Sequence, residues 1–384
     1  MSTKLAHHVD DRPFDPQEGE RLSPELERYY MSSQWRMMWL KLKRHRLAVI
    51  SAAVLACLYA SILVSEILAP YAANTRNSDY IYAPPHSVHL FHEGSLIGPF
   101  VYGWNYELDM DTLKRVYTPN TAKIERLRFF CLGDGYRFFG LLPGSFHLVC
   151  PAEGGNFFWL GTDRLGRDML SRTIYGARIS LTIGVVGVSI SFLLGIVLGG
   201  LAGYYGGFLD AMITRAIEVI RSFPKLPLFM ALSAALPIWL PPIWVYFGIT
   251  LIVGLVDWTG LARAVRAKLL ALREEDFCTA AILMGAPPRR IIGRHLLPSF
   301  MSHLIAVATL HIPEMILAET ALSFLGLGLR PPVTSWGVLL TEAQNINAVA
   351  LYPWLLLPML PVIATTLAFN FMGDGMRDAA DPYH

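Results

Sequence analysis

The sequence is poor in charged residues. Only 16% of its 384 residues are Asp, Glu, Lys or Arg, whereas 53% are hydrophobic. This composition is too apolar for an ordinary soluble domain, and charge-free runs long enough to cross a bilayer recur along the chain. The formal net charge of +2 says nothing about a nucleic-acid partner, and we expect none. The composition therefore predicts a polytopic membrane protein.

Motifs for catalysis and for cofactor binding are also missing. No G-x-x-x-x-G-K-[ST] loop occurs anywhere, so the chain cannot hold ATP by that route. None of the four cysteines has C-x-x-C spacing. His295, His303 and His311 recur every eight residues, which turns them toward different faces of a helix. We therefore expect no catalytic residue, no cofactor and no metal site, and we expect a protein that is not an enzyme.

The N-terminal segment, residues 1–46, is polar and acidic at first and ends with four Lys or Arg residues. A long polar stretch precedes the first apolar run, so no cleavable signal peptide is expected. The part from Ser33 to Arg46 mixes bases with aromatic residues and Met, which favours an amphipathic helix on the inner membrane face. The alternative is an extended basic anchor. Residues 47–69 are predicted to form the first membrane span. The basic residues before it place the N-terminal segment in the cytoplasm.

Residues 71–178 form one long polar insertion without a spanning run. Because the insertion follows a first span with a cytoplasmic N-terminus, we expect it to be extracytoplasmic. It is long enough for a small core of its own. Cys131 and Cys150 both fall within it and form either a disulfide or two buried thiols.

Residues 179–374 are predicted to form a core of five further spans. The charge-free stretch 179–209 repeats Gly195 and Gly199 at a spacing that allows close helix packing, with a pore lined by bare backbone as the alternative. Only a short apolar run follows Lys225 before a proline-rich break. The third span must therefore begin upstream and carry Arg215, Glu218 and Lys225 in its cytoplasmic end.

The last span is predicted at residues 350–372 and is followed by a cytoplasmic tail, residues 375–384. The predicted fold is thus an all-α polytopic membrane protein with six transmembrane helices. Both termini lie inside, and a large extracytoplasmic insertion separates the first and second spans.

A basic stretch, residues 263–298, separates two of the apolar runs. Its first half predicts a helix from Ala271 to Met284, because its apolar residues fall near helical spacing. Gly285 ends this helix, and Pro287 and Pro288 prevent its continuation. A short helix between two spans either lies back on the bundle or docks into a partner.

Thr279-Ala280-Ala281, then Gly285 and finally Leu297-Pro298, resembles the "EAA" loop of ABC-transporter permeases. Three further segments resemble signatures of the peptide-type branch. They are L-G-T-D-R-L-G-R-D-M-L-S-R-T-I-Y-G-A-R-I-S-L from residue 160, L-S-F-L-G-L-G-L-R-P-P-V-T-S-W-G from residue 322 and F-N-F-M-G-D-G-M-R-D-A-A-D-P from residue 369. The chain thus resembles the second, C-type permease of the oligopeptide/dipeptide/nickel family. Thr279 is a departure, since the loop's name expects Glu there.

The resemblance implies an ABC-importer permease fold in the bacterial inner (plasma) membrane. It implies four kinds of partner: a sister permease, two ATP-binding subunits, an extracytoplasmic solute-binding protein and membrane lipid. The cargo would be peptides or a related small solute. The loop 263–298 would pass force from the ATP-binding subunits to the spans. The residues expected to serve this coupling are Asp276, Phe277, Thr279, Ala280, Ala281, Gly285, Arg289, Arg290 and Pro298.

Charged groups within the spans are the candidates for a translocation path, since ionisable residues at membrane depth are commonly functional. They are Asp257, Glu314 and Glu319. For Asp257 an ion pair with Arg263 or Arg266 is the structural alternative. In the segment before the second span, an elbow helix with a pair between Asp168 and Arg172 is the structural interpretation, and a surface for the solute-binding protein is the functional one.

Two other function classes remain open from the residues alone. A secondary transporter would use the intramembrane carboxylates and would need no ATPase. A membrane-anchored scaffold would work through residues 71–178. The sequence does not identify the solute.

Overall fold

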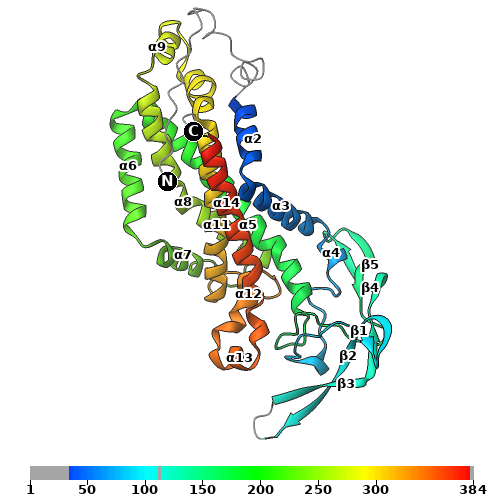
Figure 1. The fold of residues 1–384 in the computed structure, drawn as a ribbon. Coiled ribbons are helices and arrows are strands. Elements are labelled where there is room, and N and C mark those ends of the chain that lie inside the picture. The colour runs from blue at the N-terminus through cyan, green and yellow to red at the C-terminus, as the bar shows by residue number, and fades with distance from the viewer. Residues whose placement is uncertain (1–33, 111–113, 381–384) are drawn as a thin grey trace, which may run out of the picture.

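A computed structural model describes residues 34–110 and 114–380 (Figure 1). The predictions for residues 1–33 and 381–384 lie outside this part of the chain. The described part is mostly helical, and within it five helical segments are long and apolar enough to cross a membrane. The helices that supply them are α3 (Arg46–Leu63), α5 (Met169–Tyr205), α8 (Pro242–Leu272), α11 (Leu297–Phe324) and α14 (Met359–Ala380). The helix α2 (Gln34–Arg44) precedes α3.

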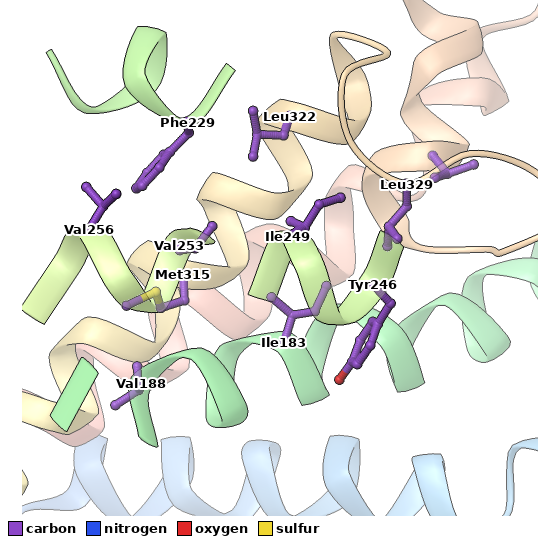
Figure 2. Packing of buried hydrophobic residues seen from close by; sticks show 11 residues of the cluster. Ile183, Val188, Phe229, Tyr246, Ile249, Val253, Val256, Met315, Leu322 and Leu329 are labelled. Carbon is purple, nitrogen blue, oxygen red and sulfur yellow. The ribbon is translucent and has the colours of Figure 1, made fainter. Parts of the chain in front are cut away.

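The interior of the bundle is built from aliphatic side chains of α5, α8 and α11 (Figure 2). Ile183 on α5, Ile249 on α8 and Met315 on α11 are completely buried in one cluster. Glycine lets α5 and α8 approach closely, because a Cβ at Gly199 would lie 2.4 Å from the carbonyl oxygen of Ala262. Gly195 and Gly199 are buried against α8. Of the two interpretations of these glycines, the structure shows close helix packing.

The predicted third span is not one helix. The helix α6 (Gly207–Ser222) and the helix α7 (Lys225–Ala234) are separated at Phe223 and Pro224. Proline lacks an amide hydrogen and disfavours helical dihedrals in the residue before it, and Phe223 accordingly has φ −89° and ψ 139°. The third span was predicted to be one helix that begins upstream of Lys225, and the structure instead has two helices there. The count of six spans stays a prediction, with α6 and α7 together in the place of the third.

The insertion contains β-structure, so the all-α prediction was wrong for this part of the chain. Three strands, β1 (His89–His92), β2 (Ser95–Asp109) and β3 (Lys114–Arg126), form an antiparallel sheet. A second sheet is the hairpin of β4 (Arg128–Phe138) and β5 (Leu142–Cys150). Apolar and polar residues alternate in the second half of β2, from Trp104 to Asp109, a pattern typical of half-buried strands. A disulfide joins Cys131 to Cys150 across the hairpin.

Short elements complete the chain. The turn α4 (Ser65–Leu68) and the 3-10 turn η1 (Ser78–Tyr80) begin the insertion. At one end of the bundle lie α9 (Asp276–Leu283) and α10 (Pro288–Arg290), followed by the π-helical turn η2 (Ile291–Leu296). After α11 come α12 (Trp336–Leu340), η3 (Thr341–Gln344), α13 (Ile346–Leu351) and η4 (Pro353–Leu356). Figure 1 shows α9 at one end of the bundle and both α13 and the sheet β1–β3 at the other.

The last helix runs further than predicted. The helix α14 continues through Gly373 and Gly375 to Ala380, where a tail was expected. Both glycines serve close packing instead of ending the helix. A Cβ at Gly373 would lie 2.5 Å from the side chain of Leu310, and one at Gly375 would lie 2.4 Å from Cβ of Ala48.

Candidate coupling loop and charged cleft

The predicted helix of the basic loop is shorter than expected. Ala271 still belongs to α8, which ends at Leu272, and α9 begins only at Asp276 after a turn. The side chain of Arg273 in this turn donates to the carbonyl oxygen of Tyr204 at 3.2 Å. This bond ties the loop to the end of α5 and holds α9 beside the bundle.

Gly285 ends α9 in a left-handed conformation with φ +77°. The amide of Ala286 donates to the carbonyl oxygen of Ala281 at 3.1 Å, and the amide of Gly285 donates to that of Ile282 at 2.9 Å. These two bonds form a Schellman cap, in which glycine is favoured because it has no Cβ to oppose positive φ. The cap turns the chain toward Pro287 and α10.

The helix α9 has two different faces. Cys278 and Ala281 are buried in a cluster with Leu269, Ile291 and other residues of α8, η2 and α11. Four large apolar residues on the other side of α9 are exposed in the described structure; they are Phe277, Ile282, Leu283 and Met284. The helix therefore lies back on the bundle with one face and leaves an apolar face uncovered.

Most of the other predicted coupling residues are exposed around α9. This group consists of Asp276, Thr279, Ala280, Arg289, Arg290 and Pro298, whereas Ala281 is buried. Pro298 lies in the first turn of α11, where the missing amide hydrogen has no cost to the helix. The structure thus brings the predicted residues to one end of the bundle, where most of them are exposed.

A second group of charged side chains lies halfway along the candidate span α8. The ammonium nitrogen of Lys225, at the start of α7, lies 2.6 Å from Oδ1 of Asp257 and 3.5 Å from Oε2 of Glu314. Nδ1 of His311 lies 3.4 Å from the same oxygen of Glu314 and 3.8 Å from Oδ2 of Asp257. Asp257 is the middle residue of α8 and is only 4% exposed.

The partner of Asp257 differs from both residues that the sequence suggested. Arg266 binds the carboxylate of Asp210 on α6, with Nη2 at 2.6 Å from Oδ2. An α-helix turns once in 3.6 residues, so a residue nine positions further along lies on the opposite face from Asp257. Lys225 was expected at the cytoplasmic end of a span and lies in this cluster instead. Arg215 and Glu218 form an ion pair on α6, with 2.8 Å between nitrogen and oxygen.

Three members of this group, Lys225, Asp257 and Glu314, line a cleft of about 410 Å³ between α7, α8 and α11. Its other walls are apolar, with Phe229, Val253 and Leu317 among the lining residues. The side chains of Lys225 and Glu314 are each about half exposed in the single chain. Charges at membrane depth are costly in lipid and normally face water or protein. This face therefore does not suit contact with lipid.

Oxygen and nitrogen atoms of Asp257, His311 and Glu314 lie within 4.8 Å of one another, close enough to hold a metal ion. However, the ammonium group of Lys225 already lies 2.6 Å from Asp257. A metal cation would have to displace this group. The side chains as they stand fit an amine better than a metal.

Glu319 lies in different surroundings from the other two carboxylates. It is completely buried, and it accepts hydrogen bonds from the hydroxyls of Ser323 at 2.8 Å, Ser335 at 2.7 Å and Ser180 at 3.2 Å. Ser335 caps α12, and Ser180 accepts from the amide of Trp336. Glu319 thus links α5, α11 and the segment that begins α12, and it does not line the cleft beside Lys225.

The segment before α5 is held by Asp163 instead of by an elbow helix. The carboxylate of Asp163 is buried and accepts from the side chains of Arg167 and Arg172. Asp168 caps α5 through a 2.7 Å bond from the amide of Ser171, so the predicted pair of Asp168 and Arg172 was wrong. Sequence spacing favoured that pair, but the cap leaves the carboxylate of Asp168 facing the backbone.

Comparison with known families agrees with this architecture. Residues 195–383 match the family described as binding-protein-dependent transport system inner membrane component. Residues 33–85 match the N-terminal TM domain of oligopeptide transport permease C.

Individual relatives are similar over most of their own length. The oligopeptide transport system permease protein OppC of Haemophilus influenzae is 42% identical over 236 residues, which are 60% of this chain and 71% of that protein. The dipeptide transport system permease protein DppC of Bacillus subtilis is 41% identical over 224 residues, which are 58% of this chain and 68% of that protein. Among solved structures, an inward-facing form of the MetNI methionine ABC transporter has a TM-score of 0.45 at 19% identity. It covers 56% of this chain and 98% of that one.

Proposed function

The chain belongs to the binding-protein-dependent transport system inner membrane components, in the C-type oligopeptide/dipeptide branch, and we propose that it carries peptides across the membrane in an ATP-driven importer. The names of its relatives support peptides as the class of cargo, since they are oligopeptide and dipeptide permeases. The chain has no phosphate-binding loop, so the ATP would be hydrolysed by two separate subunits. A sister permease would complete the path, and a solute-binding protein would deliver the peptide.

The observation that carries this proposal is the two-faced helix α9. One face is fixed to α8, η2 and α11 through Cys278 and Ala281. The exposed side chains of Phe277, Leu283 and Met284 then form an apolar surface of the kind that seats a helix in a groove. A groove on an ATP-binding subunit would move α9 when the ATPase closes, and the fixed face would pass this movement to the spans.

The charged cleft supports a path between this chain and its sister. Lys225, Asp257 and Glu314 lie on a face that lipid would not cover. A peptide carries an ammonium group, a carboxylate and apolar side chains, and the cleft offers both signs of charge beside apolar walls. We therefore assign Asp257 and Glu314 to the path and give Glu319 a structural role, because hydroxyl groups enclose it.

The orientation in the membrane follows from the same proposal. The helices α6 and α7 would together form the third of six crossings. The end that carries α9 and both termini would be cytoplasmic, where Arg289 and Arg290 satisfy the positive-inside rule. The insertion would then face outward and meet the solute-binding protein.

Reconstitution of the assembled transporter in lipid vesicles tests the proposal. We expect peptide uptake that requires ATP and the solute-binding protein. In a chain carrying Leu283→Cys, a short bifunctional maleimide should join α9 to an engineered cysteine in the groove of an ATP-binding subunit. Leu108→Cys, on β2 in the insertion, is the matched control and should give no such product.

Two results would contradict the proposal. Uptake that continues without ATP and collapses with a protonophore would indicate a secondary transporter. Equal crosslinking of residues 283 and 108 would show that α9 is not the contact.

A further inference from the structure

The hairpin of β4 and β5 exposes an unusual amount of apolar surface for a domain outside a membrane. Leu141 and Leu142 at its turn are 82% and 67% exposed. On one face of the strands, Phe130 and Leu132 are 71% and 73% exposed. Leu132 pairs with Phe146 across the hairpin, and the rings of Phe130 and Phe146 lie 6.5 Å apart. The hairpin thus exposes one apolar group on its strands and another at its turn, and exposed apolar surface of this kind on a small domain indicates a contact with another apolar surface.

The contacts of the hairpin place its turn at the end of two membrane helices. Arg178 on α5 binds Glu66 on α4 with 2.8 Å between nitrogen and oxygen, and the charge-free run of α5 begins at the next residue. The apolar helix α3 ends at Leu63, just before Glu66. This ion pair therefore marks the boundary of the apolar layer on the insertion side.

The hairpin turn is fixed to this boundary by two contacts. The amide of Phe139 donates to Oε1 of Glu66 at 3.1 Å, and the guanidinium of Arg178 lies 4.2 Å from the centre of the Phe139 ring. Further along, Nδ1 of His147 lies 2.6 Å from the carbonyl oxygen of Ala69. The hairpin consequently lies against α4, and its turn cannot move away from the membrane boundary without breaking these contacts. Figure 1 shows β4 and β5 beside α4, at the end of α3.

The backbone of the turn adopts a conformation that disfavours a bulky side chain. Phe139 has φ +48° and is followed by Gly140 with φ +75°. Asn, Asp or Gly normally occupies both central positions of such a turn, and a bulky residue there is disfavoured. The chain accepts this conformation and keeps a phenylalanine next to two exposed leucines.

We propose that the turn of the β4–β5 hairpin, residues 139–142, is inserted into the lipid interface of the leaflet on the insertion side. At the end of α3 beside it, Leu63 and the following Val64 are also exposed, so the span and the hairpin turn both present apolar side chains at this boundary. The strands have open edges with unpaired backbone groups, which cannot enter the hydrocarbon core. The turn therefore lies at the boundary of headgroups and acyl chains, about 5–10 Å deep, as amphipathic anchors do.

Such an anchor would hold the insertion at a fixed height and angle above the membrane. The disulfide between Cys131 and Cys150 joins the two strands of the hairpin to each other. The contact of His147 with Ala69 and the hydrogen bond from Thr75 to Asp134 tie the hairpin to the start of the insertion. This inference concerns only the insertion and the lipid, and it stands or falls separately from the role of α9.

Spin-label accessibility in the assembled transporter in lipid nanodiscs tests the proposal. Leu141→Cys is labelled with a nitroxide in a chain that also carries Cys57→Ser, since Cys57 is exposed on α3. Leu108→Cys is the control, because Leu108 is also an exposed leucine near a hairpin end but belongs to the sheet β1–β3. We expect the ratio of oxygen to nickel-chelate accessibility to be several-fold higher at residue 141 than at residue 108.

Two outcomes would overturn the proposal. Equal ratios at the two positions would show that the turn lies in water. Low accessibility to both reagents at residue 141 would show that protein, such as a sister permease, covers it. If Leu141→Cys does not fold, Leu142→Cys provides the same measurement at the neighbouring exposed position.

Discussion

The ammonium nitrogen of Lys225 lies 2.6 Å from a carboxylate oxygen of Asp257, in the middle of α8. The contact joins α7 to α8 at the point where the predicted third span is broken by Pro224. Since α7 begins at Lys225, the break is what allows this side chain to enter the cleft. The same ammonium group is 3.5 Å from Glu314 on α11, so it links three helices.

Removing Lys225 should therefore destabilise the protein and stop transport. In Lys225→Met the carboxylate of Asp257 stays buried without its partner. Loss of one partner of a fully buried pair costs about 3–5 kcal/mol, and the half-exposed position of Lys225 reduces this to about 2 kcal/mol. Adding Asp257→Asn should restore most of the stability but not the uptake of peptide. Denaturant unfolding in detergent and uptake in vesicles measure the two effects.

The pair of Arg215 and Glu218 on α6 is the matched control for Lys225. Both side chains are exposed, and they lie three residues apart on one helix. Such pairs contribute only about 0.3–0.5 kcal/mol, so Arg215→Met should leave stability nearly unchanged. A loss as large as that of Lys225→Met would mean that burial of Asp257 is not the cause.

The cap at Gly285 gives a second prediction. A Cβ there would meet nothing within 4 Å, so only the backbone with φ +77° limits the substitution. Non-glycine residues pay roughly 1–2 kcal/mol in this region, and Asn tolerates it better than β-branched residues. Gly285→Val should lose most ATP-dependent uptake while the chain still inserts in the membrane, and Gly285→Asn should keep most of it. Normal uptake by the valine variant would argue against α9 as the coupling element.

The sequence predicted best what depends on local pattern. Apolar runs located the five long helices, and Gly285 with Pro287 located the end of α9, because caps and spans are encoded by adjacent residues. The partner of Asp257 was not predictable in this way. Lys225 lies 32 positions earlier in the chain, and only the packing of α7 on α8 brings the two together.

The β-strands of the insertion were not predicted from the sequence. Alternation favours a strand only in the second half of β2, from Trp104 to Asp109, and β3 has no such pattern, so local sequence is a weak signal for the sheet. The last span was predicted to end at residue 372, before Gly373. Glycine can end a helix, but it also permits close packing within one. Whether a glycine ends a helix or allows close packing depends on the neighbouring helix, which is α11 for Gly373 and α3 for Gly375.

The insertion should lose stability in acid through His86. This side chain is buried, and the amide of Phe158 donates to its Nδ1 at 3.0 Å. Burial lowers the pKa of His86 from 6.5 to about 4. The unfolded chain then binds more protons between these values, so stability is complete above pH 6.5 and falls as the pH decreases toward 4. The total loss is about 3 kcal/mol, because each pKa unit corresponds to about 1.4 kcal/mol.

Hydrogen exchange of the β2 and β3 amides between pH 4 and 7, corrected for intrinsic rates, measures this dependence on pH. His86→Gln keeps an acceptor for the amide of Phe158 but cannot be protonated, so its protection should change much less with pH. His92→Gln, in the neighbouring strand β1, serves as the control variant. An unchanged pH dependence in His86→Gln would assign the acid sensitivity to another group.

Two adjacent glycines on α5 allow a sharp test of helix packing. A Cβ at Gly199 would lie 2.4 Å from the carbonyl oxygen of Ala262, whereas one at Gly200 would be 3.8 Å from the nearest atom, on Leu269. Alanine is favoured over glycine within a helix by about 1 kcal/mol, so Gly200→Ala should be neutral or stabilising. Gly199→Ala gains the same propensity but must push α8 away, and overpacking of this kind typically costs about 1–3 kcal/mol. Thermal unfolding in detergent should therefore rank Gly200→Ala at or above the unsubstituted chain and Gly199→Ala below it. Equal stability of the two variants would mean that α5 and α8 are not in close contact at Ala262.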